Sequence, residues 1–285
     1  MATTSLRHVR LGPALLLVAA LAWPARPLAQ GGPVPIFTAF CNTTGGLRIE
    51  VAVNGVTIER STGQELVSAQ LNSWLLAGKN RLRVRTPPGG NIAKGAGVKC
   101  EVVRSIPRKP PIETVLARLA WMAPAGKAPG RLDRTLEIAV PVRDAPPCDL
   151  WERAEKLKLD GPTRAAVLGK VGELEAALRS ADVKKVLALQ QFSNEDWVRC
   201  NGKDLEEFRR WAPEQARAIV EVLAPKKFTV WDPARAKVEL VAGGRVAQVT
   251  VDGGPPIVVQ GTDKDDRSVI QPFVARIDGV FLLVR

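Results

Sequence analysis

Residues 47–59, Leu-Arg-Ile-Glu-Val-Ala-Val-Asn-Gly-Val-Thr-Ile-Glu, decide the fold of the first half of the chain. Large apolar side chains alternate with polar or small ones on both sides of Asn54-Gly55, as in strands with one buried face. Asn-Gly is the strongest short-range hairpin signal, because a type I′ turn needs positive φ at both central residues. The stretch therefore predicts an antiparallel hairpin.

Other strand-like runs surround this hairpin, and stretches rich in proline and glycine separate them. The runs cover residues 34–40, 66–71, 80–85, 98–104, 115–122 and 132–140. Several short strands with regular turn signals, and no long helical pattern between them, indicate a sandwich. We assign residues 30–145 to an all-β antiparallel sandwich domain.

Residues 71–85, LNSWLLAGKNRLRVR, resemble a segment of the galactose-binding-like jelly rolls that accompany many glycosidases. In those modules an apolar turn, then Gly and Asn, leads into an alternating strand. The resemblance covers about fifteen residues. It implies a jelly-roll fold and brings no sugar-binding residues with it.

After Pro147 the apolar period becomes helical. We expect one helix over residues 149–159 and a longer one whose apolar face includes Val167 and Leu178. A further helix should begin after a cap at Ser180, and the last should cover residues 204–223 with a break at Pro213. Strands at residues 238–241, 245–251, 269–277 and 280–284 follow as an antiparallel meander. Helices before strands indicate an α+β domain, which we assign to residues 146–285.

Two segments of this second domain resemble the nuclear transport factor 2-like superfamily. Residues 178–189, LRSADVKKVLAL, are similar to its opening helix, and residues 273–284, FVARIDGVFLLV, are similar to its closing hairpin. The resemblance implies a cone-shaped α+β domain. Enzymes, binding modules and adaptors share that scaffold, so the fold does not decide the function.

Residues 1–29 have the organisation of a secretory signal peptide. Arg7 and Arg10 precede an apolar run over residues 14–23, and cleavage is expected after Ala29, with Ala25 as the second choice. The run has about half of the roughly 20 residues that a membrane-spanning helix needs. We therefore predict a periplasmic or extracellular protein with no transmembrane segment in its mature chain.

Cleavage would remove His8, which is the only histidine, and the chain contains no tyrosine. Ser-His-Asp triads and His-ligated metal sites are thereby excluded from the mature protein. The sequence also lacks a P-loop, a dinucleotide-binding glycine pattern and a nucleophile elbow. We expect no catalytic residues, no metal and no cofactor.

Four cysteines remain in the mature chain, namely Cys41, Cys100, Cys148 and Cys200. An even number in an oxidising compartment predicts two disulfides. Two of them precede Pro146-Pro147 and two follow it, so Cys41–Cys100 and Cys148–Cys200 would keep each disulfide within one domain. A four-thiolate zinc site is disfavoured, because such sites pair cysteines two to four residues apart.

Positive charge is concentrated in the first half, which holds 16 Lys/Arg and 8 Asp/Glu between Gln30 and Pro147. Within it, Arg81, Arg83 and Arg85 alternate with apolar residues, and Lys79 is in register. A strand would place these cations on one face about 7 Å apart, where they could hold successive phosphates or carboxylates. A solvated outer face is the alternative. An exposed Trp74 beside this strand would favour polysaccharide stacking.

These features favour an exported binding protein over an enzyme. Its partner would be an anionic envelope polymer, a lipid surface or another protein. An adaptor or toxin-neutralising role is compatible with this interpretation. Export makes nucleic acid an unexpected partner. The alternative is a His-independent hydrolase or isomerase with a pocket in the second domain lined by Asp or Glu, and a buried carboxylate there would favour it.

Overall fold

The computed structural model describes residues 33–285, apart from 62, 64–65, 88–91, 109, 125–130, 224–226, 229–230 and 261–266. Pro33–Arg285 form one compact unit. The predicted signal peptide lies outside the described residues. We call the part with strands β1–β8 the sandwich half and the part from helix α1 to strand β15 the α+β half.

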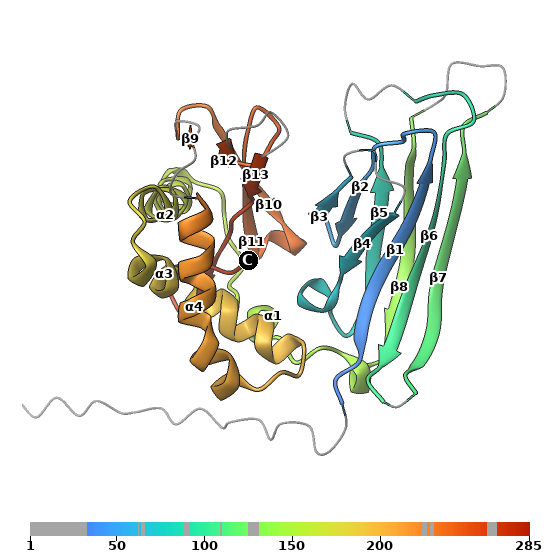
Figure 1. Ribbon diagram of the computed structural model, residues 1–285, viewed down its shortest axis with the longest axis horizontal. Coiled ribbons are helices and arrows are strands. Elements are labelled where there is room, and N and C mark those ends of the chain that lie inside the picture. The colour runs from blue at the N-terminus through green and yellow to red at the C-terminus, as the bar shows by residue number, and fades with distance from the viewer. Residues whose placement is uncertain are drawn as a thin grey trace, which may run out of the picture. The chain divides into compact units, whose positions relative to one another are not determined.

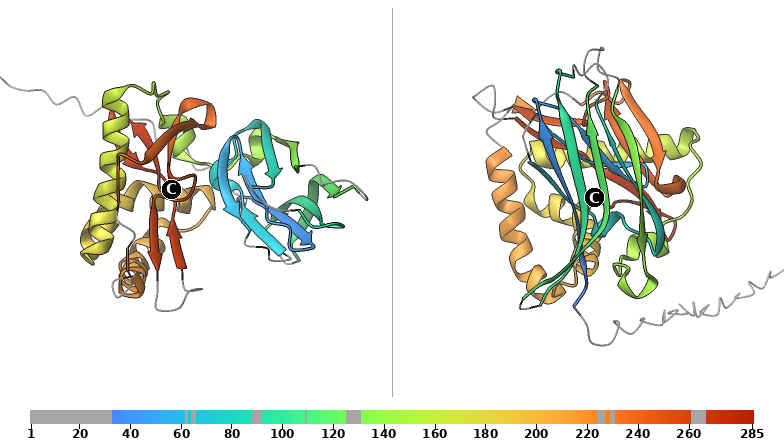
Figure 2. Two further views of the ribbon diagram at one scale, coloured as in Figure 1. Left: turned by 90° about the horizontal axis from the view of Figure 1, so that it is seen from above. Right: turned by 90° about the vertical axis from the view of Figure 1, so that its right-hand side faces the viewer.

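The sandwich half consists of two four-stranded antiparallel sheets (Figure 1), as the sequence predicted. The first sheet has the order β4-β1-β6-β7, with β1 at Ile36–Thr44, β4 at Leu66–Gln70, β6 at Gly97–Ile106 and β7 at Ile112–Met122. The second has the order β3-β2-β5-β8, with β2 at Glu50–Val53, β3 at Val56–Arg60, β5 at Gly78–Arg85 and β8 at Asp133–Val140. The long β6 and β7 strands run side by side in Figure 2.

The predicted hairpin is the pair β2 and β3. Its turn residues Asn54 and Gly55 both have positive φ, 50° and 87°, as a type I′ turn requires. Val53 and Val56 on either side of the turn are almost fully buried. The turn chemistry and the burial of the flanking valines together fix the register of this hairpin.

Both predicted disulfides are present, with the predicted pairing. Cys41 of β1 and Cys100 of β6 are directly opposite each other in the strand register, and they form the first disulfide inside the sandwich core. Cys148 and Cys200 form the second within the α+β half. In the chain-entropy model, each disulfide stabilises the fold by about 4 kcal/mol, because each closes a loop of more than fifty residues.

The α+β half contains the helices α1 (Asp149–Arg153), α2 (Gly161–Arg179), α3 (Val183–Cys200) and α4 (Leu205–Leu223). Asp160 caps α2 by accepting a hydrogen bond from the Thr163 N–H at 2.9 Å. Asp182 caps α3, so the cap lies two residues after the predicted Ser180. No helix in the described part of the chain combines the length and apolar character needed to cross a bilayer.

Helix α4 is continuous through Pro213, so the predicted break there is wrong. A proline inside a helix removes one backbone hydrogen bond and crowds the preceding turn. In α4 the buried stripe of Phe208, Ala212, Ala216 and Val220 packs on both sides of the proline. This tertiary packing offsets the local cost.

Two antiparallel sheets follow the helices. One has the order β10-β11-β14-β15, with β10 at Ala236–Val241, β11 at Val246–Val251, β14 at Phe273–Ile277 and β15 at Val280–Leu283. The other has the order β13-β12-β9, with β9 at Lys227–Phe228, β12 at Ile257–Gln260 and β13 at Arg267–Ile270. The strand predicted at 269–277 is therefore two strands in different sheets, separated by Pro272, which cannot donate to a ladder.

One hydrophobic cluster extends through both halves. Its sandwich members include Phe37, Leu71 and Trp74. Its members from the α+β half are Leu150, Ala154, Val246, Phe273, Ala275, Ile277 and Val284. A second cluster lies within the α+β half, between α2, α4 and the strands. The two predicted domains therefore share part of their core.

Candidate anion-binding face

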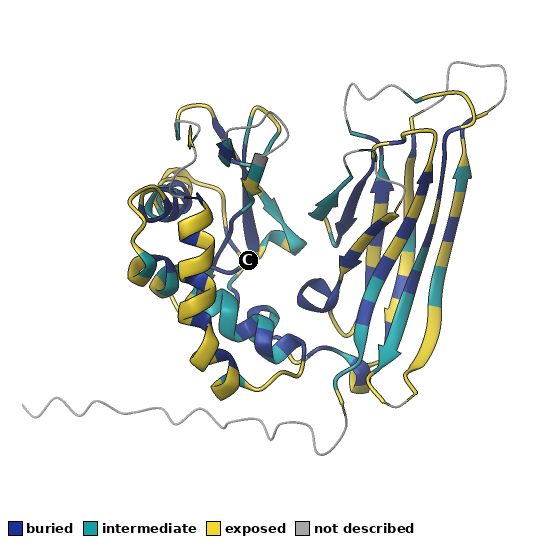
Figure 3. Ribbon diagram, viewed as in Figure 1, coloured by how far each residue is buried: buried dark blue, intermediate teal, exposed yellow. Residues whose placement is uncertain are grey.

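The basic residues of β5 lie on the side of the strand away from the sandwich core. Leu82 and Val84 are fully buried, whereas Lys79, Arg81 and Arg83 are exposed and Arg85 is half-buried, so Figure 3 shows β5 with alternating colours. Period-two strand geometry produces this separation. The four cations therefore share one outer face, which we call the β5 face.

Carboxylates on strand β8 pair with two of these cations. Lys79 Nζ lies 3.2 Å from a Glu137 carboxylate oxygen. Arg83 donates two hydrogen bonds to Asp133, from Nε at 2.7 Å and from Nη2 at 2.5 Å. Strand β8 runs antiparallel beside β5, which brings both carboxylates to the same outer face.

A third carboxylate comes from the other neighbouring strand, β2. Glu50 has a side chain that is only 8% exposed, and it pairs with Arg85 at 2.7 Å and with Arg60 at 3.1 Å. Two guanidinium groups thus satisfy one nearly buried carboxylate, which would otherwise be costly to bury. Arg85 therefore has a structural role on this face, because it balances the charge of Glu50.

The hydrogen bond from Arg83 lowers the pKa of Asp133 below its ordinary value, and the positive charges of Arg85 and Arg131 act in the same direction. The same hydrogen bond raises the pKa of Arg83. Both groups therefore stay charged at neutral pH. An incoming anion must compete with Asp133 for the Arg83 guanidinium.

Arg81 is the exception on this face, because it makes no ion pair with the described residues. Its backbone is held firmly: the Arg81 N–H donates to Asn54 Oδ1 at 3.0 Å, and its carbonyl accepts from the Asn54 N–H at 2.9 Å. The side-chain amide of Asn54 in turn donates to the fully buried Asn80 at 2.9 Å. Arg81 is thus an exposed cation on a rigid backbone.

The β5 face is therefore a network of ion pairs with excess positive charge. Five cations, Lys79, Arg81, Arg83, Arg85 and Arg60, surround three carboxylates, Glu50, Asp133 and Glu137. The sequence predicted the cations but missed the carboxylates. Finding them requires the strand order β2-β5-β8, which brings together segments that are far apart in the chain.

Trp74 does not belong to this face, which corrects the prediction of a ligand-stacking residue. Its side chain is buried, with the residue 7% exposed, and packs against Phe273 at a centroid distance of 5.0 Å and Trp151 at 6.1 Å. The apolar turn that carries Trp74 is directed into the core shared by the two halves. A polysaccharide has no access to the faces of a ring packed in this way.

A buried ion pair adjoins Trp74. Arg285 donates from Nη2 to Asp196 at 2.6 Å, and the two side chains are 9% and 1% exposed. The Arg285 guanidinium also lies 5.6 Å from the Trp74 ring centroid. Burial lowers the pKa of Arg285, and the negative charge of Asp196 opposes that shift. The pair joins α3 to the C-terminal strand region beside the sandwich turn.

Asp196 also lies close to Cys148 and Cys200, so the three side chains have the spacing of a metal site. The two sulfur atoms are bonded to each other, however. A disulfide offers no thiolate to a metal. The cluster is structural in this state.

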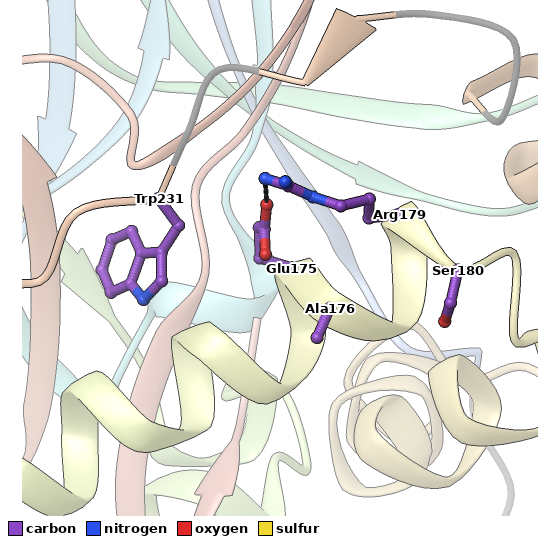
Figure 4. Close-up of a pocket in the computed structure, with 5 residues that line it drawn as sticks. All are labelled: Glu175, Ala176, Arg179, Ser180 and Trp231. Carbon is purple, nitrogen blue, oxygen red and sulfur yellow. Dashed lines mark hydrogen bonds and ion pairs between the residues drawn. The ribbon is translucent and has the colours of Figure 1, made fainter.

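The α+β half has a surface pocket of about 440 Å³, lined by Glu175, Ala176, Arg179, Ser180 and Trp231. In Figure 4, Glu175 lies between Trp231 and Arg179, and the dashed line marks its ion pair with Arg179. Trp231 rests against α2 at Gly172, where an added Cβ would lie 3.1 Å from the indole Nε1. The only local signal for this pocket is the i,i+4 spacing of Glu175 and Arg179.

The pocket contains the buried carboxylate that the alternative enzymatic function would need. Glu175 is 7% exposed, but its charge is already compensated by Arg179. The Arg179 guanidinium is also held 5.9 Å from the Phe228 ring centroid. The lining residues that the structure describes supply a single carboxylate, whereas acid–base catalysis by carboxylates uses a pair. The arrangement therefore favours a structural ion pair.

Comparison with known proteins gave no match: no family model, no curated protein and no solved structure is similar to this chain.

Proposed function

We propose that the protein is an exported, non-enzymatic binding protein that holds an anionic partner on its β5 face, in the cell envelope or the secreted fraction. The observation that carries the proposal is Arg81, an exposed cation on a hydrogen-bonded backbone and without an ion pair among the described residues, within a face of net positive charge. The excess of Lys and Arg throughout the first half of the chain supports it.

The arrangement suits a partner with repeated negative groups. A phosphate or carboxylate would bind Arg81 first, because its guanidinium makes no ion pair within the described residues; Glu137, directly opposite Arg81 in the strand register, pairs with Lys79 instead. Neighbouring anionic groups of the partner could then displace Glu137 from Lys79, because the ion pair between these two side chains is largely exposed and therefore weak. The pair between Arg83 and Asp133 is bidentate and should persist. An envelope polymer or a lipid surface with spaced anionic groups fits this chemistry.

Export is supported by the signal-like first 29 residues and by the two disulfides, which persist in oxidising compartments. We also propose that the α+β half has the cone-shaped arrangement of the nuclear transport factor 2-like superfamily. Its order of helices followed by antiparallel strands supports this assignment. The jelly-roll assignment for the sandwich half is supported by Asn80, which orders the turn before β5 by bonding the backbone of Leu76.

The test is binding of the full chain to vesicles of phosphatidylglycerol in phosphatidylcholine and, separately, to polyphosphate. Arg81→Glu should weaken binding to the preferred probe, because a charge-assisted hydrogen bond is worth about 1.5–3 kcal/mol, equivalent to roughly ten- to hundredfold in affinity. Binding should also weaken as salt is raised. Arg81 is chosen over Arg85 because reversal of Arg85 would leave the nearly buried Glu50 with one partner.

Lys99→Glu is the matched control. Lys99 is exposed on β6, in the other sheet of the same half, so the variant changes the total charge equally. An unchanged affinity in Lys99→Glu with a loss in Arg81→Glu supports the β5 face. Equal affinities in both variants and the wild type, or no binding to either probe, would overturn the proposal.

A further inference from the structure

The apolar side of helix α4 is wider than the part of it that is buried. Phe208, Ala212, Ala216, Val220 and Leu223 form the buried side, which packs on the rest of the α+β half. Figure 3 shows much of the remaining surface of α4 as exposed. Folding requires only the buried part of the helix surface to be apolar, so the exposed apolar residues of α4 are not explained by folding.

The exposed part contains Trp211, Ala218 and Val222, with the polar Gln215 between them; all four are exposed and follow one another at intervals of four, three and four residues. This is the spacing of the apolar seam in a coiled coil. Trp211 is 36% exposed, Val222 is 57% exposed, and Ile219 beside them is 49% exposed. We call these five residues the α4 seam.

Trp211 is held in a defined orientation although it is exposed. Its ring makes an edge-to-face contact with Phe208 at a centroid distance of 4.6 Å. Phe208 is itself 9% exposed and packs in a small cluster with Val198 and Ala212. A preoriented tryptophan loses little conformational entropy on binding, and tryptophan is enriched at the energetic centres of interfaces.

An acidic row borders the seam. Glu207, Glu214 and Glu221 are spaced seven residues apart, which places them along one edge of the seam. All three are exposed, and the described residues provide no ion pair for any of them. In coiled coils, charges at such flanking positions select the partner helix.

We propose that the α4 seam binds an amphipathic helix of another protein, with apolar residues at heptad spacing and a flanking row of Lys or Arg. Charge complementarity selects this occupant. In a symmetric antiparallel pair of α4 helices, each acidic row would face its own copy and repel it. The seam lies apart from the β5 face, so this proposal does not depend on anion binding there.

The probes are two labelled synthetic helical peptides with the same leucine heptads, one with lysine and one with glutamate at the flanking positions. Fluorescence anisotropy measures their binding to the full chain. We expect the lysine peptide to bind at least about tenfold more tightly, a difference of about 1.4 kcal/mol. Glu214→Lys combined with Glu221→Lys should reverse this preference, and Trp211→Ala should weaken binding of both peptides.

Glu206→Lys is the matched control on the same helix, because Glu206 lies away from the seam and pairs with Arg209. It should leave the peptide preference unchanged. Val222→Lys provides a second seam variant whose side chain is mostly exposed, should Trp211→Ala lose its fold by circular dichroism. Equal binding of the two peptides, or binding that survives the seam variants, would overturn the proposal. Self-association of the protein that Val222→Lys abolishes would also overturn it, because the occupant of the seam would then be a second copy of the chain.

Discussion

At the scale of single residues, the most consequential contact is the buried pair of Arg285 and Asp196. Asp196 accepts from Arg285 at 2.6 Å and also from the Leu150 N–H at 3.1 Å. The carboxylate therefore connects α3, α1 and the end of the chain beside Trp74. A buried pair adds little over an apolar pair of the same shape, but loss of one partner leaves an uncompensated buried charge.

We expect Asp196→Ala to lower the free energy of unfolding by about 3–5 kcal/mol, because it leaves the Arg285 guanidinium buried without its counter-ion. Urea denaturation measures this change. Arg235→Ala is the control, since its ion pair with Asp252 is at the surface and exposed pairs contribute less than about 1 kcal/mol. If Asp196→Ala lowered the free energy of unfolding no more than the control does, water would be solvating the charge of Arg285 in place of Asp196.

At the scale of elements, two glycines of α2 have different surroundings. A Cβ added at Gly169 would have no described atom within 4 Å beyond its own stretch of helix, whereas a Cβ at Gly172 would lie 3.1 Å from the Trp231 indole. The helix therefore tolerates a side chain at one position and uses its absence at the other. Gly172 is what lets Trp231 form a wall of the pocket in Figure 4.

Gly169→Ala should raise the free energy of unfolding by about 0.5–1 kcal/mol, because alanine has the higher helix propensity. Gly172→Ala should gain less or lose stability, since the indole must move, and its tryptophan fluorescence should change. Thermal denaturation of the two variants makes the comparison. Equal stabilisation with unchanged fluorescence would mean that Trp231 does not pack on α2.

The sequence predicted those features that are determined by neighbouring residues or by the order of a few residues in the chain. Asn54-Gly55 specifies its own turn, and the cysteines on either side of Pro146-Pro147 could be paired by their order in the chain. The continuity of α4 through Pro213 depends on packing against other helices, so local propensity led to the wrong prediction. The sheet β13-β12-β9 has very short strands, which carry little periodic signal.

The same limit applies to the β5 face. Alternation within β5 placed Lys79, Arg81 and Arg83 together, because period two is a property of a single strand. Their carboxylate partners lie on β2 and β8, and the burial of Trp74 depends on Phe273, which is far away in the chain. Those facts follow from the tertiary fold and have no counterpart in local sequence.

At the scale of the whole molecule, the shared hydrophobic cluster determines how the two halves behave. Ile277 of β14 is 2% exposed and belongs to the same cluster as Phe37 of β1. Neither half could separate from the other without exposing these side chains to water. The two disulfides, in contrast, each lie within one half.

We expect Pro33–Arg285 to unfold in one cooperative transition, with coincident curves from far-ultraviolet circular dichroism and tryptophan fluorescence. Ile277→Ala should move both curves together, with a loss of about 2–5 kcal/mol. Calorimetry provides the independent check, since the calorimetric and van't Hoff enthalpies should agree. Two separate transitions would contradict a shared core and favour independent domains.

The Asn-Gly turn between β2 and β3 also has a chemical consequence over time. Asn followed by Gly is the dipeptide most prone to deamidation. The Asn54 amide now donates to the Trp74 carbonyl and to Asn80, and deamidation would replace it with a carboxylate oxygen facing those same acceptors. The new negative charge would also lie at the backbone N–H of Arg81, the proposed first contact of the β5 face. Ageing at a single amide would thus loosen the turn and add a negative charge to the face that the proposed anion binds.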